Sequence, residues 1–315
     1  MYPCRLLITT PPIGSDFCLK EADQQQKALE WLQAEHKRLS MTYGPDHPAT
    51  LIALQNLGGV YAASNRYEEA IKSLRQVVDR RVAVLGRCHE GTLPARRDLA
   101  EALAATCRFA EAIAEYEALY DDNLSAFGPD DPRTLVDAAR LFQLIHENGH
   151  PAEAAAEMAT LLPVAERVFG VDAPLTLTLR NNLAYGYRAA GRLGEAIPLY
   201  ERTLADRERV LGPDHRTVAV VLYQLGSAQL ALGNASTAAQ ALRRAVSIDQ
   251  AVYGADHPAL AIDLEALAVA QQMTNDTAAA VANFEKALGI WLNADGPDTP
   301  HVTELRERIY ALQAE

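Results

Sequence analysis

A spacing of 42 residues runs through most of this 315-residue chain and constrains its fold more than any other feature. The first series at this interval consists of Gly44, Gly86, Gly128, Gly170, Gly212, Gly254 and Gly296. The second consists of Ala28, Ala70, Ala112, Ala154, Ala196, Ala238 and Ala280, and the third of Leu57, Leu99, Leu141, Leu183, Leu225, Leu267 and then Ile309. A period of this length, repeated six times or more, indicates a solenoid whose units stack on their neighbours.

Each repeat is predicted to contain two amphipathic helices. In the first repeat, Asn65 and Arg66 separate two segments with helical apolar patterning, and Ala70, Leu74 and Val77 follow the i, i+4, i+7 spacing of one helical stripe. The residue that follows the leucine series on the first helix is glycine or alanine in every repeat except the third, which has Phe142, and the second helix keeps its alanine throughout. The two helices should therefore approach closely, and a bulky side chain at any of these alanines should cost ~1 to 3 kcal/mol by overpacking.

A connector of the form Gly-Pro-Asp-His-Pro joins one repeat to the next. Its glycine, Gly44 in the first case, suits a left-handed residue that ends a helix, and the proline behind it cannot continue that helix. Asp46 or His47 can then cap the following helix, with Pro48 tolerated in its first turn. The connector therefore predicts a helix end followed at once by a helix start.

The repeat resembles the tetratricopeptide repeat (TPR). The resemblance is carried by Leu57-Gly58, Tyr61, Ala70 and Leu74, and by the segment 176–196, TLTLRNNLAYGYRAAGRLGEA, which is similar to the 42-residue variety typified by kinesin light chains. It implies an all-α fold: a right-handed TPR superhelix, or α-solenoid, of about six helix-turn-helix repeats with half-repeats at both ends. Because the family consists mostly of scaffolds, it also implies a role in protein-protein interaction.

The resemblance covers residues 23–315, with repeats starting near 44, 86, 128, 170, 212 and 254 and a terminal half-repeat from 296. Residues 24–43 should form a lone second helix, and 300–315 a lone first helix. Residues 1–22 are expected to be a tail, partly extended or disordered. Within it the strand-like segment 5–10 is stopped by Pro11 and Pro12. This tail could pack on the first helix, remain disordered, or pair with another copy and so support a homo-oligomer.

The charge balance narrows the class of partner. With 41 acidic and 29 basic residues, the chain has a net charge of -12, which repels phosphate backbones and anionic lipids. No nucleic-acid or membrane partner is therefore expected. No uncharged apolar run reaches the ~18 residues that a transmembrane helix needs. The four cysteines lack the spacing of a zinc site or a disulfide framework, so we expect reduced thiols and a cytoplasmic protein.

The concave groove of the superhelix is the predicted binding surface. On the first helix of each repeat, helical geometry places several polar positions opposite the leucine series, and in the resembling family that stripe lines the groove. Asn56 and Asn182 match the family's groove asparagine, which there hydrogen-bonds the backbone of a bound extended peptide. The candidate ligand-binding residues are Asn56, Arg97, Arg140, Asn182, Arg188, Tyr223 and Gln224.

Three of these candidates are arginines in an acidic protein. Arg97, Arg140 and Arg188 would favour a partner segment that carries a carboxylate or phosphate, through charge-assisted hydrogen bonds. Asp98 and Glu101 on the same stripe argue for some internal neutralisation. The expected partner is therefore a protein or peptide with an acidic segment.

No catalytic or metal site is predicted. Phosphate-binding, nucleophile-elbow and zinc-protease motifs do not occur in the sequence. His47, His215 and His257 recur at one connector position and are interpreted as turn residues. His146 and His150 lie four residues apart but lack a third ligand in the sequence pattern. We therefore expect no metal and no cofactor.

The function predicted from the sequence is that of a non-enzymatic scaffold that holds a peptide or protein segment in its groove. Rigid helices would keep asparagine and arginine donors in place, so that binding orders mainly the partner. One alternative is a regulator or sensor, in which a peptide or small effector changes the superhelical pitch. A third and less favoured alternative is an enzyme that uses the groove as its active site.

Overall fold

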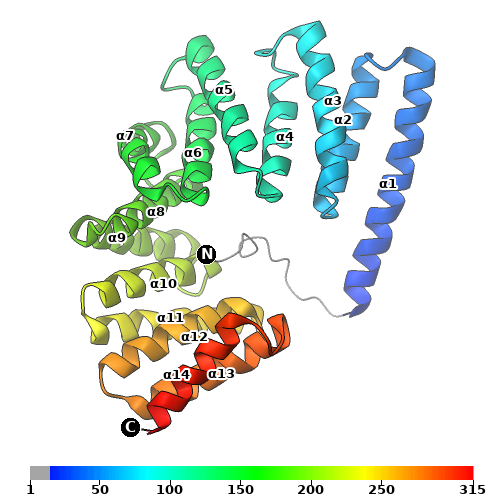
Figure 1. The fold of residues 1–315 in the computed structure, drawn as a ribbon. Coiled ribbons are helices and arrows are strands. Elements are labelled where there is room, and N and C mark those ends of the chain that lie inside the picture. The colour runs from blue at the N-terminus through cyan, green and yellow to red at the C-terminus, as the bar shows by residue number, and fades with distance from the viewer. Residues whose placement is uncertain (1–14, 315) are drawn as a thin grey trace. The chain divides into compact units, whose positions relative to one another are not determined.

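The computed structural model describes residues 15–314, and this part of the chain is built from helices alone (Figure 1). The helices are α1 (Ser15–Tyr43), α2 (Pro48–Ala63), α3 (Tyr67–Leu85), α4 (Leu93–Ala105), α5 (Phe109–Phe127), α6 (Pro132–Glu147), α7 (Pro151–Phe169), α8 (Pro174–Ala189), α9 (Leu193–Leu211), α10 (Arg216–Ala231), α11 (Ala235–Tyr253), α12 (Pro258–Met273), α13 (Thr277–Asp295) and α14 (Pro300–Ala314). Six helix pairs thus follow one another between the single helices α1 and α14, which confirms the predicted α-solenoid class.

The chain divides into two compact units, residues 1–150 and 151–315. Within each unit every helix packs on the helices next to it in the sequence, as in a solenoid. First helices of neighbouring repeats also touch, α2 with α4 in the first unit and α8 with α10 and α10 with α12 in the second. The strand-like segment expected at 5–10 lies outside the described residues, whereas residues 15–22 belong to α1.

The connector histidines cap helices. The imidazole Nδ1 of His47 accepts a hydrogen bond from the Ala49 amide at 3.2 Å, which satisfies one of the amides left open at the start of α2. His215 and His257 do the same for α10 and α12, and the carboxylate of Asp131 does so for α6. Their interpretation as turn residues is confirmed.

The connector glycines depart from the predicted left-handed conformation in one respect. Gly86 has a positive φ of 89°, but its ψ is 161°, and Gly212 has 90° and 156°. This region of backbone space is open essentially to glycine alone, whereas the left-handed helical region also admits asparagine. The backbone conformation at these positions therefore restricts the residue to glycine more strictly than the predicted left-handed conformation would.

Small residues sit where the two helices of a repeat cross. The alanines of the second helices, Ala70, Ala112, Ala154, Ala196, Ala238 and Ala280, have no exposed surface. A β-carbon added to Gly58 would lie 2.8 Å from Cγ of Leu74, and one added to Gly226 would lie 2.6 Å from Cγ of Leu242. The predicted pairing of a small residue with a large neighbour is confirmed at both crossings.

The helices are too polar or too short to act as bilayer spans. Over residues 15–314, none combines the length and apolar character that crossing a membrane requires.

Candidate functional site

The first unit contains a hollow of about 570 Å³ on the side where α2 and α4 meet. Its walls come from three consecutive helices, α3 contributing Tyr67 and Leu74. The lining residues are Gln55, Asn56, Gly59, Val60, Ala62, Tyr67, Leu74, Asp98, Glu101, Ala102 and Ala105.

Small side chains create this hollow. Gly59 and Ala62 on α2 and Ala102 and Ala105 on α4 all line it. A β-carbon built on Gly59 meets no heavy atom within 4 Å, so the space beside this glycine is open. The hollow is therefore a consequence of residue size at four positions.

Polar groups line the hollow, and most of them are already engaged. Gln55 donates to Asp98 with Nε2 and Oδ2 2.6 Å apart, and it accepts from Arg81 at 2.7 Å. Asn56 is exposed and lines the hollow, and its side-chain amide forms no hydrogen bond with any residue from 15 to 314. Of the candidates predicted on this unit, Asn56 is the one whose donor and acceptor are both open to a ligand.

Arg140 is neutralised by a carboxylate of the hollow. Its Nε and Nη2 donate to Glu101 at 2.7 and 2.6 Å, and Glu147 lies 3.5 Å from its Nη1. Burial alone would raise the pKa of Glu101, but the hydrogen bonds from Arg140 hold that pKa below its ordinary value. The internal neutralisation expected from Glu101 is therefore present.

Arg97 is held in the same way by a buried acid. It donates two hydrogen bonds to the carboxylate of Asp137, and Asn123 of α5 donates a third at 2.6 Å. Asp137 has no exposed surface. Neither Arg97 nor Arg140 is thus a free cation for a partner, although the sequence pattern alone could not distinguish free arginines from paired ones.

The other four candidates belong to the second unit. Arg188 lies over the ring of Tyr185, 4.7 Å from its centroid, and its Nε is buried without a hydrogen-bond partner. The Oε1 atom of Gln224 is likewise buried and unpartnered. Tyr223 is half-buried, and its burial raises the pKa of its phenol. Asn182 lies on α8, the same helix as Arg188.

The seven candidates are therefore divided between the two units rather than gathered in one described surface. Asn56, Arg97 and Arg140 lie in residues 1–150, and the remaining four in residues 151–315. We treat the hollow of the first unit and the polar stripe of the second as separate candidate sites.

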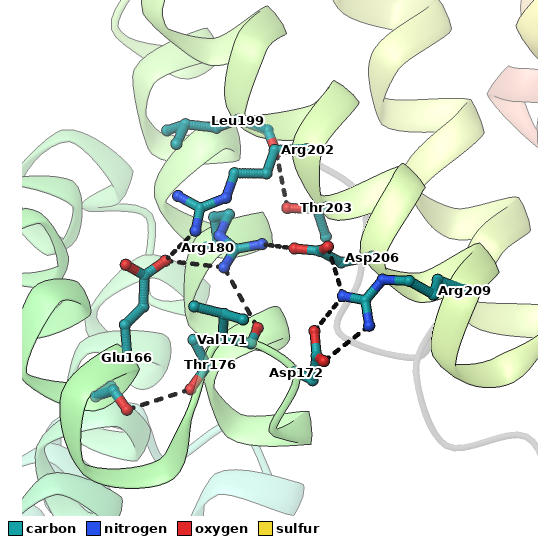
Figure 2. Close-up of polar contacts among 11 residues, drawn as sticks. Glu166, Val171, Asp172, Thr176, Arg180, Leu199, Arg202, Thr203, Asp206 and Arg209 are labelled. Atoms are coloured by element: carbon teal, nitrogen blue, oxygen red, sulfur yellow. Dashed lines mark hydrogen bonds and ion pairs between the residues drawn. The ribbon is translucent and has the colours of Figure 1, made fainter.

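A cluster centred on Arg180 was not singled out in the sequence (Figure 2). Arg180 is fully buried and donates to Asp206 at 2.7 Å and to Glu166 at 2.8 Å, so that it joins α7, α8 and α9. Arg209 extends the cluster by bridging Asp206 and Asp172. The two carboxylates that bind Arg180 come from helices that pack on α8 within the same unit. The cluster therefore links these three helices and has a structural role.

Two buried aspartates of the second unit were also missed. Burial and, to a smaller extent, the negative charge of Asp249 raise the pKa of Asp263 to about 8; burial raises the pKa of Asp249 to about 6. The signal that could have found them is the repeat itself, since they stand in register with Asn123 and Asp137. In the described part of the chain, no three histidine, cysteine or carboxylate side chains come together in a group that could hold a metal ion.

Stacked helical hairpins of one repeated length, with a hollow on the stripe formed by the first helices, define a helical-repeat protein of the interaction type. The sequence profile of the tetratricopeptide repeat matches residues 17–83, 143–206, 175–251 and 240–293. The chain belongs to the tetratricopeptide repeat family, whose members are typically protein-protein interaction scaffolds. A search of curated protein sequences found no match.

Two solved structures with TM-scores of 0.60 share the fold. BtubC (BKLC) from P. vanneervenii is 16% identical with a TM-score of 0.60, and the alignment covers 73% of this chain and 92% of that one. A tetratricopeptide repeat protein from Parabacteroides merdae is 14% identical with a TM-score of 0.60, over 93% and 95% of the two chains. A putative kinesin light chain from Podosopora anserina with nearly identical TPR-like repeats is 21% identical, over 79% and 98%, with a TM-score of 0.41.

Proposed function

We propose that the protein is a non-enzymatic scaffold that binds an extended peptide or protein segment in the hollow between α2 and α4. The observation that carries the proposal is the coincidence of an open space of about 570 Å³ with the unengaged amide of Asn56 in its lining. An amide side chain can pair with both the N–H and the C=O of a peptide backbone. The small residues Gly59 and Ala105 leave room for the side chains of such a segment.

The negative charge around the hollow determines which charge the bound peptide segment can carry. Asp98 and Glu101 both line it, and the arginines expected to attract an acidic partner are occupied by Glu101 and Asp137. In this proposal the hollow takes a neutral or basic segment, because an acidic one would meet like charge. Among the predicted candidates of the second unit, Arg188 is the one cation, and it forms no ion pair with a carboxylate among the described residues.

The test is a selection of displayed random peptides against the purified protein, followed by affinity measurements with the enriched peptides. Gly59→Leu should place a side chain in the hollow, since nothing lies within 4 Å of the new β-carbon. We expect this variant and Asn56→Ala to weaken the enriched peptides by roughly tenfold or more, which corresponds to the loss of one or two well-made contacts.

Gly289→Leu is the matched control, because Gly289 is a helical glycine of α13 with equally open surroundings and no place in the hollow. It should bind the selected peptides as the unaltered protein does. Peptides that bind Gly59→Leu and the unaltered protein equally, or a selection that enriches nothing, would contradict the proposed function.

A further inference from the structure

Three positions of the repeat carry a neutralised ion pair in the first unit. In the second unit the same positions carry two carboxyl groups and no cation. Arg97, Asn123 and Asp137 occupy the same repeat positions as Tyr223, Asp249 and Asp263, which follow three repeat lengths later in the chain. The helices correspond as well: α4, α5 and α6 in the first unit, and α10, α11 and α12 in the second. The comparison is therefore between equivalent places of one repeated structure.

In the first unit the buried carboxylate of Asp137 has both a cation and an amide as hydrogen-bond donors. Asp137 accepts two hydrogen bonds from the guanidinium of Arg97, at 2.6 and 2.8 Å, and one from the amide of Asn123 at 2.6 Å. Arg97 keeps about a quarter of its side chain exposed (28%), so its guanidinium enters from the solvent side of the stripe. A cation and an amide thus offset the desolvation of one carboxylate.

In the second unit the cation and the amide are both missing. Tyr223 replaces the arginine, and a second carboxylate, Asp249, replaces the asparagine. Asp263 is 4% exposed and Asp249 is 8% exposed, and the Oδ2 atom of Asp263 is buried with no hydrogen-bond partner. A buried acceptor of this kind carries its full desolvation penalty unless another group satisfies it.

The surrounding charges do not supply the missing cation. Arg216 of α10 lowers the pKa of Asp249 through its charge, but within residues 15–314 it forms no ion pair with either aspartate. Arg188 of α8 acts on Tyr223, whose phenol is neutral at ordinary pH. On α13, Trp291 donates its ring N–H to Glu265. None of the residues described from these packed helices bonds the free oxygen of Asp263.

We propose that Asp249 and Asp263 form a recognition site for a guanidinium group, presented by an arginine side chain of a bound protein segment. The guanidinium would donate to the free Oδ2 of Asp263, as the guanidinium of Arg97 donates to Asp137 in the first unit. The ring of Tyr223 beside it supplies a face on which a guanidinium can stack. This site uses none of the residues of the hollow, so a test of the guanidinium site is independent of the test of the proposed function.

Binding at this site is coupled to a proton. Because the pKa of Asp263 lies at about 8, the carboxyl group is protonated at neutral pH when the site is empty. An incoming guanidinium favours the carboxylate, and the proton passes to the buffer. Uptake of the arginine should therefore release about one proton at neutral pH.

The probe is a blocked Gly-Gly-Arg-Gly-Gly peptide, titrated into the full chain and followed by ligand-observed NMR. The matching peptide with citrulline in place of arginine keeps the shape and removes the charge. We expect the arginine peptide to bind roughly tenfold or more tightly than the citrulline peptide, the difference that a charge-assisted hydrogen bond produces. Calorimetry in two buffers of different ionisation enthalpy should show the released proton.

Three variants and one control complete the test. Asp263→Asn and Asp249→Asn should each lose the preference for arginine, and Tyr223→Arg should lose it as well because it supplies the guanidinium from within. Asp256→Asn, at an exposed connector position, should retain it. Equal binding of the two peptides, or a preference that survives in Tyr223→Arg, overturns the proposal. Tyr223→Arg decides the matter even if an aspartate variant fails to fold, since it places an arginine where the first unit has Arg97 and leaves both aspartates unchanged.

Discussion

Arg97 and Asp137 form a two-pronged ion pair, with Nε and Nη2 of the arginine 2.6 and 2.8 Å from the two carboxylate oxygens. The pair joins α4 to α6, the first helices of consecutive repeats, and its acid has no contact with solvent. An arginine that the sequence pattern suggested for a partner is therefore part of the link between repeats.

Removing the arginine should be costly for the fold. Arg97→Met leaves the buried carboxylate of Asp137 without its cation, and we expect the free energy of unfolding to fall by ~3 to 5 kcal/mol. Urea denaturation followed by circular dichroism measures the change. In Arg192→Met, which breaks a pair with Glu195 whose side chains are both 52% exposed, the loss should stay under ~1 kcal/mol. Equal losses in the two variants would show that burial of Asp137 does not govern the effect.

Two adjacent glycines of α2 should respond in opposite ways to the same substitution. Gly58→Ala drives a β-carbon to within 2.8 Å of Cγ of Leu74, and overpacking should cost ~1 to 3 kcal/mol. Gly59→Ala meets open space and should stabilise the helix by ~0.5 to 1 kcal/mol, because alanine loses less backbone entropy than glycine on folding. Thermal unfolding of the pair checks both signs. A destabilised Gly59→Ala would contradict this account of the crossing.

The turn inside the second hairpin holds a strained cysteine. Cys107 has a φ of 59°, a left-handed conformation that Gly149, Gly191 and Gly233 share at the same position of other repeats, although with larger φ values. Cys107→Gly should therefore raise the free energy of unfolding by ~1 kcal/mol. The control is Cys107→Ala, which removes the thiol but keeps the β-carbon, and which should gain little. A similar gain in both variants would assign the effect to the thiol rather than to the backbone.

The buried Asp263 should give the stability a distinctive pH dependence. Its folded pKa, about 8, lies above the ordinary value of 3.8, so the folded state binds more protons than the unfolded state between these values. Its contribution to stability is complete below the unfolded pKa and is lost as pH rises through the folded one. Asp263→Asn should therefore gain in stability relative to the unaltered protein as pH increases from about 5 to about 8.

Urea titrations at several pH values measure this difference. Asp131→Asn serves as the comparison, because hydrogen bonds from Arg133 lower the pKa of Asp131 to about 2. Its contribution is present above the unfolded pKa and disappears only in acid, so its difference from the unaltered protein should be flat across the same window. An Asp263→Asn difference that is equally flat would mean that Asp263 is ionised in the folded protein.

Much of the fold could be predicted from the sequence because its determinants lie within one repeat length. The glycine and alanine series, the histidines that cap helices and the pairing of Gly58 with Leu74 all depend on neighbours along the chain or on the adjoining helix. The candidate site could be predicted from the sequence only in part. Asn56 was found because helical geometry and the family resemblance both place it on the stripe, whereas the state of Arg97 depends on a carboxylate 40 residues away.

A solenoid of paired helices follows from the sequence alone, since a repeated pattern of residue size and turn chemistry allows few other ways to bury its apolar stripes. Which charges remain available to a partner became clear from the packing of the helices. Coulomb and desolvation energies depend on distances between helices and on exclusion of water, and neither is written in a linear pattern. For this reason Arg140 is neutralised by Glu101. Asp263 occupies the same repeat position as Asp137, which is paired with Arg97, but no cation pairs with Asp263 among the described residues.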